Sequence, residues 1–386
     1  MSSSLESRFA VNFRHRVFFV RDLAGAGWPV MEEALDDTRR MLMVVEEAVD
    51  TAWPGWKESV AARLGKRLAG EPLVLGGGEK CKRDQKVWMR VVGAIHEHGI
   101  DRHSGVMVAG GGAFLDAVGF AAATAHRGVR LLRLPTTTLS QGDSGVGVKC
   151  GLNLFGKKNF LGAFAVPYAV VNDYGFLATQ GERGRREGLV EAVKVAAIKD
   201  ADFFEWLEAN VAELRDLRVD AVEEAVRRSA ELHFQHITEG GDPFEAGSSR
   251  PLDFGHWSAH KLESMSGYRL SHARAVGIGL AVDTLYSHAV GLLPQDDACR
   301  MLRLLHRLGL RLHHNMLERR DSTGAREVLA GVEEFREHLG GRLTVLMLEA
   351  IGRGRDVNEL DGELVDRCVA ALATGAWMEE CFTPGI

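Results

Sequence analysis

Three histidines stand within 17 residues of one another near the middle of the second half of the chain. His256 and His260 lie four residues apart on an expected helix, which places both imidazoles on one face. His272 follows twelve residues later. Three imidazoles and a carboxylate can form a catalytic zinc site with an open position. The four-residue spacing by itself indicates His256 and His260 as the metal pair, and solvated or hydrogen-bonded histidines are the alternative.

A carboxylate for such a site is available in the stretch EGLVEAVKVAAIKD, which holds Glu187, Glu191 and Lys194. The other positions of this expected helix are largely apolar. We therefore expect at least one of the three charged side chains to face inward.

A glycine triplet, Gly110–Gly112, follows an expected strand and precedes an expected helix. Glycines at such a place let the backbone approach a pyrophosphate, and the helix N-terminus offers unpaired N–H groups. The triplet lacks the GxGxxG fingerprint, so a tight structural turn is the alternative. A second cluster, Gly76–Gly78, also follows a short strand and is either a similar feature or a surface turn.

A polar, glycine-rich stretch begins at Pro135 and contains Asp143, Lys149, Lys158 and Asn159. Its low apolar content predicts a long loop that wraps a polar ligand. Lysines pair with phosphate as mobile point charges. A solvated surface loop is the alternative.

The elements that must position these residues change character along the chain. Short β-branched runs are followed by glycines or Pro-Thr and then by helical stretches, which predicts parallel βαβ units. Beyond about residue 183, apolar residues recur at helical spacing, and residues 343–348 fit either a strand or a helix. The expected strands are residues 16–20, 40–45, 73–75, 106–109, 130–134 and 169–172, and the expected helices include 187–198, 221–236 and 296–308.

The predicted fold class is therefore α/β plus α. A Rossmann-like parallel-sheet domain is expected over residues 1–180 and an α-helical domain over residues 181–386. A cleft between two such halves is a common place for a ligand.

Composition narrows the class of partner and the compartment. The chain has 386 residues and a net charge of −6, without a dominant lysine or arginine run. We therefore expect neither a nucleic acid nor a membrane partner. No signal peptide and no apolar stretch of about 18 residues is recognised, which predicts a soluble cytoplasmic protein. The cysteines form no CxxC pair and predict reduced thiols; they are Cys81, Cys150, Cys299, Cys368 and Cys381.

As a group, these residues resemble 3-dehydroquinate synthase and the related sugar phosphate cyclases. The order and spacing of the motifs match over roughly residues 40 to 350. The matching segments are Gly110–Phe120, Arg127–Gly128, Pro135–Thr137, Asp143–Lys149, Lys158–Asn159, Val190–Lys194 and Phe254–His260. The resemblance implies an NAD-binding α/β domain, an α-helical metal domain with zinc or cobalt, and a homodimer.

The resemblance also implies roles for individual residues. Glu191, His256 and His272 would bind the metal, which departs from the pair that spacing alone indicates. His260 would be a catalytic acid/base, with Glu245, Lys149 and Lys194 as further catalytic candidates. The implied NAD site comprises Glu46, Glu79, Lys82, Gly110, Gly111, Gly112, Asp116, Thr136, Thr137, Lys158, Phe176 and Thr179. The implied sugar phosphate site comprises Arg127, Asp143, Lys149, Asn159, Lys194, Arg250 and Asp253.

The implied chemistry is a cyclisation in which the cofactor is recycled. NAD⁺ transiently oxidises a secondary hydroxyl, phosphate is eliminated, the ketone is reduced again, and ring opening precedes an intramolecular aldol closure. The metal polarises the oxygen that is oxidised.

Departures from the family pattern cluster where the substrate would bind. The family's Leu-Asn before Phe-Gly-His is Leu252–Asp253, and its arginine four residues earlier is Ser249, with Arg250 one step away. Loss of a bidentate guanidinium beside an added carboxylate disfavours a carboxylated substrate. His233 and Glu187 stand where the family has lysine and asparagine.

The chain therefore resembles the cyclases that convert sedoheptulose 7-phosphate to valiolone-type cyclitols, with 2-epi-valiolone favoured over 2-epi-5-epi-valiolone. Three alternatives stay open. They are 3-dehydroquinate synthase itself, a metal-dependent polyol dehydrogenase, and a non-catalytic homologue.

Overall fold

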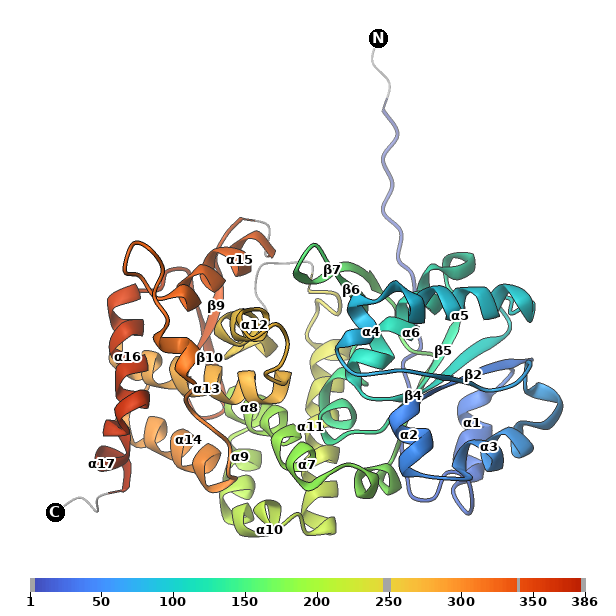
Figure 1. Ribbon diagram of the computed structural model, residues 1–386, viewed down its shortest axis with the longest axis horizontal. Helices are drawn as coiled ribbons and strands as arrows, with labels where there is room; N and C mark the ends of the chain where they lie inside the picture. The colour runs from blue at the N-terminus through green and yellow to red at the C-terminus, as the bar shows by residue number, and fades with distance from the viewer. Residues whose placement is uncertain (1–3, 246–250, 339–340, 383–386) are drawn as a thin grey trace.

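The computed structural model describes residues 4–245, 251–338 and 341–382. Figure 1 shows two halves side by side, with the blue-to-cyan N-terminal strands on one side and the yellow-to-red helices on the other. All pairings in the main sheet are parallel, which confirms the predicted α/β half. The strands in sheet order are β1 (Val17–Val20), β8 (Ala169–Asp173), β5 (Arg130–Pro135), β4 (Gly105–Gly110), β2 (Met41–Glu46) and β3 (Leu73–Leu75).

The central strands are buried along their whole lengths because helices cover both faces of the sheet. In β4, Val106 and Val108 belong to the core on one face, and Met107 and Ala109 to the core on the other. Helices α5 (Gln85–Glu97) and α6 (Gly112–Thr124) contribute to the first core, and α1 (Trp28–Leu35) and α3 (Trp56–Leu64) to the second. Burial on both faces explains why these strands read as continuous apolar runs.

The second half is mainly helical, as predicted, and its buried core begins at Leu189, whereas the two sheet cores end at Phe176. Its helices are α7 (Glu182–Gly188), α8 (Val190–Lys199), α9 (Ala201–Ala209), α10 (Val211–Arg215), α11 (Val219–Glu239), α12 (His256–Met265), α13 (His272–Ala289), α14 (Gln295–Arg307), α15 (Ala330–His338), α16 (Gly362–Thr374) and α17 (Ala376–Phe382). Among the described helices, none is both long and apolar enough to cross a membrane.

Two segments show details that the sequence did not give. The expected helix over residues 187–198 is two helices that meet at Leu189. The ambiguous segment 343–348 contains the start of strand β9 (Val345–Ala350), which pairs antiparallel with β10 (Arg353–Val357). A short buried apolar run has no periodicity that separates strand from helix, so only its partner strand decides.

The polar stretch after Pro135 is not the irregular loop that its composition predicts. It begins with a helical turn over Ser140–Ser144 and continues as a hairpin of β6 (Lys149–Leu154) and β7 (Lys157–Phe164). Phe155 and Gly156 join the strands, and both have positive φ, as the tight hairpin turns favoured by strand twist require. Most of β7 is exposed, so the usual apolar alternation is weak.

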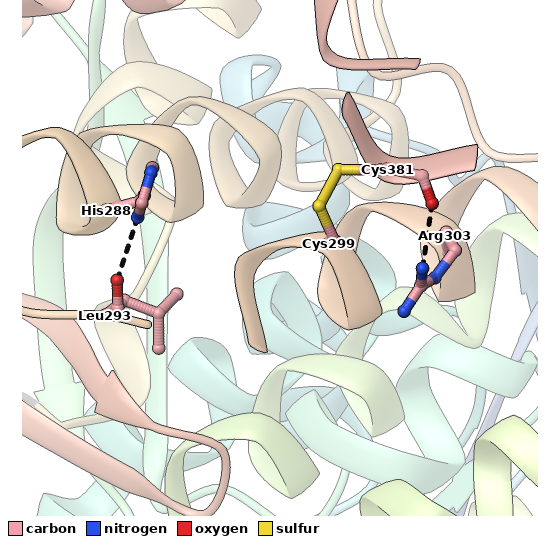
Figure 2. Close-up of a disulfide and its surroundings, with 5 residues drawn as sticks. All are labelled: His288, Leu293, Cys299, Arg303 and Cys381. Atoms are coloured by element: carbon pink, nitrogen blue, oxygen red, sulfur yellow. Dashed lines mark hydrogen bonds between the residues drawn. A yellow bond between two sulfur atoms is a disulfide. The ribbon is translucent and has the colours of Figure 1, made fainter. Parts of the chain in front are cut away.

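The cysteine prediction is wrong for two of the five thiols. Cys299 on α14 and Cys381 on α17 form a disulfide, with Cα atoms 5.0 Å apart (Figure 2). Nearby, Arg303 Nη1 donates to the Cys381 carbonyl at 2.8 Å. The pair is 82 residues apart in sequence, so only the packing of α14 against α17 brings the sulfurs together. The other three cysteines are buried and free, and the cytoplasmic location stays a prediction.

Candidate metal and cofactor site

Three side chains from three helices converge in the helical half. Glu191 lies on α8, and His256 and His272 are the first residues of α12 and α13. Their ligand atoms all lie within 4.8 Å of one another. A glycine with positive φ precedes His256, and the Ser271 side chain caps α13 beside His272. These are the three residues that the resemblance implies, rather than the His256–His260 pair that spacing indicates.

The state of the Glu191 carboxylate tests whether a cation fits. The residue is 1% exposed, and neither carboxylate oxygen accepts a hydrogen bond. Lys194 Nζ lies 2.6 Å from Oε2 as an ion pair outside hydrogen-bonding geometry, and His272 Nε2 lies 3.6 Å from Oε1. A buried carboxylate without hydrogen bonds is costly unless another group compensates it. A divalent cation between Glu191 and the imidazoles fits this arrangement.

Both candidate histidine ligands are oriented through their other ring nitrogen. His256 Nδ1 lies 3.0 Å from the Phe254 carbonyl oxygen, and His272 Nδ1 lies 3.0 Å from Glu263 Oε2. When Nδ1–H donates to these oxygens, Nε2 keeps its lone pair for a metal, which is the usual arrangement around a metal-bound histidine. Sequence reasoning missed Glu263, although its position three residues after His260 places both on one side of α12.

Lys158 lies at the histidine cluster and not at the glycine loop. Its Nζ is 2.8 and 2.7 Å from the two oxygens of Glu263 and 3.3 Å from His272 Nδ1. His260, Glu263 and His272 form a second group with metal-ligand spacing. Both oxygens of Glu263 accept hydrogen bonds from Lys158, whereas neither oxygen of Glu191 accepts one, so the cluster around Glu191 is the better cation site.

Burial keeps two of the imidazoles neutral. Burial and the nearby Lys194 charge lower the pKa of His256 to about 3. Burial and Lys158 hold the pKa of His260 well below its ordinary value. The His260 ring centroid lies 5.4 Å from that of His256. Both rings therefore retain a lone pair at neutral pH, which suits one to ligation and the other to accepting a proton.

Charged groups extend the cluster toward the helical turn that follows β5. Asp143 Oδ1 lies 2.8 Å from His233 Nδ1. Burial raises the pKa of Asp143, but Lys194 and His233 outweigh it, and the net pKa lies well below the ordinary range. Burial lowers the pKa of Lys194, but Glu191, Asp143 and Asp253 raise it further. Asp143 and Lys194 are therefore both charged at neutral pH.

The β6–β7 hairpin carries a second polar cluster. Lys149 forms an ion pair with Glu245, and Asn159 contacts Lys82. Lys82 Nζ also lies 2.6 Å from Asp116 Oδ2, and its side chain is 3% exposed. Glu79 accepts a hydrogen bond from Asn153 Nδ2 at 2.6 Å. Most of these predicted ligand residues are thus held in pairs that fix their positions.

A cavity of about 360 Å³ joins the two halves of the site. On the α/β side it is lined by half of the twelve residues implied for the cofactor, and on the helical side by His272 and Ala273. Phe176 does not line it, because the ring packs in the core with centroids 5.0 Å from those of Trp53 and Trp56. The six lining residues are Glu46, Gly111, Gly112, Thr136, Thr137 and Thr179.

Glu46 ties the two glycine clusters together. Its Oε2 accepts from Gly111 N at 2.7 Å, and its Oε1 accepts from Gly78 N at 3.0 Å. The Gly111 amide that was expected to face a pyrophosphate is therefore occupied by a side chain. A Cβ on Gly112 would lie 2.5 Å from Ser144 Oγ, and one on Gly110 would lie 2.6 Å from Phe114 Cδ1. Close packing therefore requires glycine at Gly110 and Gly112.

Some predicted substrate residues are not brought to this site. Arg127 ends the turn before β5, whereas Thr136 and Thr137 follow the carboxyl end of the same strand. In a parallel sheet these lie at opposite edges, so the chain's own Arg127 does not reach the cavity. Ser249 and Arg250 lie outside the described residues.

Arg133, which sequence reasoning missed, organises the turn after β5. Its side chain is fully buried, and Nη1 donates to the carbonyls of residues 144, 145 and 147, the last at 2.6 Å. Nη2 donates to the Lys149 carbonyl at 3.1 Å. The arginine thus fixes the backbone between Asp143 and Lys149. An arginine inside the apolar run RLLRLP was the available signal.

The protein thus has an α/β half and a helical half, with a candidate metal centre beside a candidate nucleotide cavity. Residues 72–187 match the 3-dehydroquinate synthase N-terminal family, and residues 188–329 match the 3-dehydroquinate synthase C-terminal family. A 3-dehydroquinate synthase from Cereibacter sphaeroides is 35% identical over 314 residues, or 80% of this chain and 82% of that protein. Another from Pelotomaculum thermopropionicum is 34% identical, covering 82% of each chain. The chain belongs to the 3-dehydroquinate synthase family.

Solved structures place the fold among the sugar phosphate cyclases. A 2-epi-5-epi-valiolone synthase from Streptomyces hygroscopicus subsp. jinggangensis, with NAD⁺ and Zn²⁺ bound, superposes with a TM-score of 0.85. It is 26% identical, and the match covers 96% of this chain and 100% of that one. A 2-deoxy-scyllo-inosose synthase with carbaglucose-6-phosphate, NAD⁺ and Co²⁺ has a TM-score of 0.73 at 20% identity, with 92% and 95% coverage, and supports the fold alone.

Proposed function

We propose that this chain is a sugar phosphate cyclase that eliminates phosphate from sedoheptulose 7-phosphate and closes the product to a valiolone-type cyclitol, with 2-epi-valiolone favoured. The observation that carries the proposal is the position of the candidate metal cluster. His272, which lies with Glu191 and His256, lines the same cavity as Gly111 and Gly112. The similarity to a valiolone-type synthase that binds NAD⁺ and Zn²⁺ supports the same cofactors here.

The residues divide the chemistry among them. When bound, NAD⁺ would accept a hydride from a secondary hydroxyl, and Zn²⁺ or Co²⁺ would polarise that oxygen. Glu191, His256 and His272 would hold the ion. We assign proton transfer to neutral His260, beside His256, with Glu245 as a second candidate.

Binding of the substrate falls to the polar groups around the cluster. Lys149 and Asn159 on the hairpin would hold the phosphate, and the buried Lys194 ammonium would hold ring oxygens. Asp143, fixed by His233, would accept hydrogen bonds from substrate hydroxyls. Arg133 positions this backbone without contacting substrate.

The choice of sedoheptulose 7-phosphate rests on charge. The three carboxylates that act on Lys194 are those of Glu191, Asp143 and Asp253. A substrate carboxylate beside Asp253 would be repelled, whereas a hydroxymethyl group would not.

The second candidate is 3-dehydroquinate synthase itself, which the names of the sequence relatives favour. The purified protein is incubated with NAD⁺ and Zn²⁺ or Co²⁺ and with either sedoheptulose 7-phosphate or 3-deoxy-arabino-heptulosonate 7-phosphate. We expect phosphate release and a cyclitol, identified by NMR, from the first substrate only. Turnover of the second alone would establish the rival.

Two further outcomes are distinguishable in the same experiment. Sustained accumulation of NADH would identify a polyol dehydrogenase, because the cyclase recycles its cofactor. Absence of turnover together with absence of bound metal and NAD would identify a non-catalytic homologue. A homodimer is part of the proposal, and light scattering on the purified protein measures it.

A further inference from the structure

A second and larger cavity, of about 530 Å³, lies beside the proposed active site. It is formed where α7 and the start of α13 meet the segment after α14. Glu187 and Ala273 line both this cavity and the one that holds the glycine loop. Ala273 directly follows His272, so the two cavities are neighbours. No step assigned above uses this second cavity.

The lining of this cavity is strongly basic. Of its nine residues, four are arginines and only Glu187 is acidic; the arginines are Arg183, Arg186, Arg274 and Arg311. The chain as a whole carries a net charge of −6, so the concentration of positive charge is local. Guanidinium groups that line one cavity repel one another. An anionic ligand would relieve this repulsion.

Glu187 shows that the cavity wall accommodates an anion. Its Oε1 lies 2.8 Å from Arg183 Nε and 3.5 Å from Arg274 Nε. Its Oε2 accepts a hydrogen bond from Ser271 Oγ at 3.1 Å, at the N-terminus of the 18-residue helix α13. One carboxylate cannot compensate four guanidinium groups. Arginine forks are well matched to phosphate, which accepts paired hydrogen bonds.

The remaining lining restricts the rest of the ligand. The other residues are Ala273, Gly277, Gly309 and Leu310, with no aromatic side chain on which a base could stack. The volume falls in the range of small-molecule sites. We propose that this cavity is a second binding site for a phosphorylated polyol, held by its phosphate group next to the active cavity. The binding of phosphate does not depend on the proposed function, but the choice of a polyol rests on it.

Calorimetry at low salt tests the proposal without turnover. Inorganic phosphate and glucitol 6-phosphate are titrated into the full chain, the variant Lys149→Gln, and the double variant Arg183→Gln/Arg311→Gln. The wild-type chain is expected to bind two equivalents of glucitol 6-phosphate. Lys149→Gln is expected to weaken binding at the active cavity by about tenfold or more, and Arg183→Gln/Arg311→Gln is expected to weaken binding at the second cavity by the same factor. Each variant should leave the other site unchanged. The double variant Arg90→Gln/Arg353→Gln removes the same charge from exposed positions and is expected to bind like wild type.

Three results would overturn the proposal. They are a single wild-type site that Lys149→Gln weakens, equal binding by the Arg183→Gln/Arg311→Gln variant and wild type, and equal loss in the Arg90→Gln/Arg353→Gln control. If the second cavity binds inorganic phosphate as tightly as glucitol 6-phosphate, the choice of a polyol is wrong and the cavity is a site for free phosphate. Failure of the proposed function would appear as absent turnover and as loss of the site that Lys149→Gln weakens, whereas the site that Arg183→Gln/Arg311→Gln weakens would remain.

Discussion

The glycine loop and His272 of the histidine cluster line the same cavity, but the two regions are built in different ways. At the loop, backbone atoms and the lack of side chains make the surface, as at Gly111 and Gly112. At the cluster, side chains from three helices converge, and each is held by another group. The first kind of surface is sensitive to added atoms, and the second is sensitive to removed atoms.

The largest effect is expected at the histidine cluster. His256→Ala should weaken zinc binding by more than about 100-fold, because loss of even an outer partner of a ligand costs 10- to 100-fold. Competition with a chromophoric chelator measures the affinity. His288→Ala is the matched control, since His288 lies near the far end of α13 and contacts the Leu293 carbonyl (Figure 2). Equal affinity in both variants would contradict the assigned cluster.

Arg133→Met tests how far the buried arginine stabilises the backbone between Asp143 and Lys149. The variant leaves four carbonyl groups without their donor, and we expect a loss of about 2–3 kcal/mol in the free energy of unfolding. KM should rise more than kcat falls, because the backbone between Asp143 and Lys149 is released. Urea denaturation and steady-state kinetics measure both. Arg130→Met, in the same strand but paired with Asp37 at the surface, should cost less.

Adjacent glycines sharpen the comparison within the loop. Gly112→Ala places a Cβ 2.5 Å from Ser144 Oγ. We expect the free energy of unfolding to fall by about 1–2 kcal/mol and NAD binding to weaken. Gly111→Ala is the control, because its Cβ would meet Thr137 Cγ2 at an ordinary 3.5 Å. Thermal unfolding and NAD titration compare the two. Equal behaviour would show that the loop relaxes freely.

Asp283 provides a test through pH. It is fully buried on α13 and accepts hydrogen bonds from Gly255 N and Trp257 Nε1, on either side of His256. Burial raises the pKa of Asp283 to about 7. Between about pH 4 and that value the folded chain keeps a proton that the unfolded chain has released, so its stability falls as pH rises.

Asp283→Asn removes this titration. Its free energy of unfolding should decline less steeply than that of wild type across the window, by on the order of 1 kcal/mol per pH unit. Denaturation curves at several pH values measure the slope. Asp202→Asn, at an exposed position, should leave the slope unchanged. A parallel shift of the whole curve would mean that the carboxyl group does not titrate in this range.

Much of the fold was predictable because the strands lie inside a two-faced core. Burial on both faces requires unbroken apolar runs, and each of the six predicted strands lies within one residue of its observed ends. The hairpin of residues 149–164 was not predictable from composition, since β7 is mostly exposed and carries no apolar alternation. The signal for strands is therefore strongest where burial is greatest.

The candidate site, like the fold, was predictable only in part. The types of its residues could be listed from the sequence, because imidazole, carboxylate and ammonium groups in a mostly apolar helix are conspicuous. The contacts that these side chains make with one another could not be read from spacing. Glu263 holds both Lys158 and His272, which places Lys158 at the histidine cluster instead of the glycine loop.

By itself, the sequence determined the α/β-plus-α class and the set of residues from which a metal and phosphate site could be built. The resemblance already implied that Glu191 joins His256 and His272, which spacing alone does not indicate. Tertiary structure alone decided that Arg127 lies at the far edge of the sheet and that Cys299 pairs with Cys381. The reason is physical: periodicity reports which face of an element is buried, whereas contacts between distant residues depend on how whole elements pack.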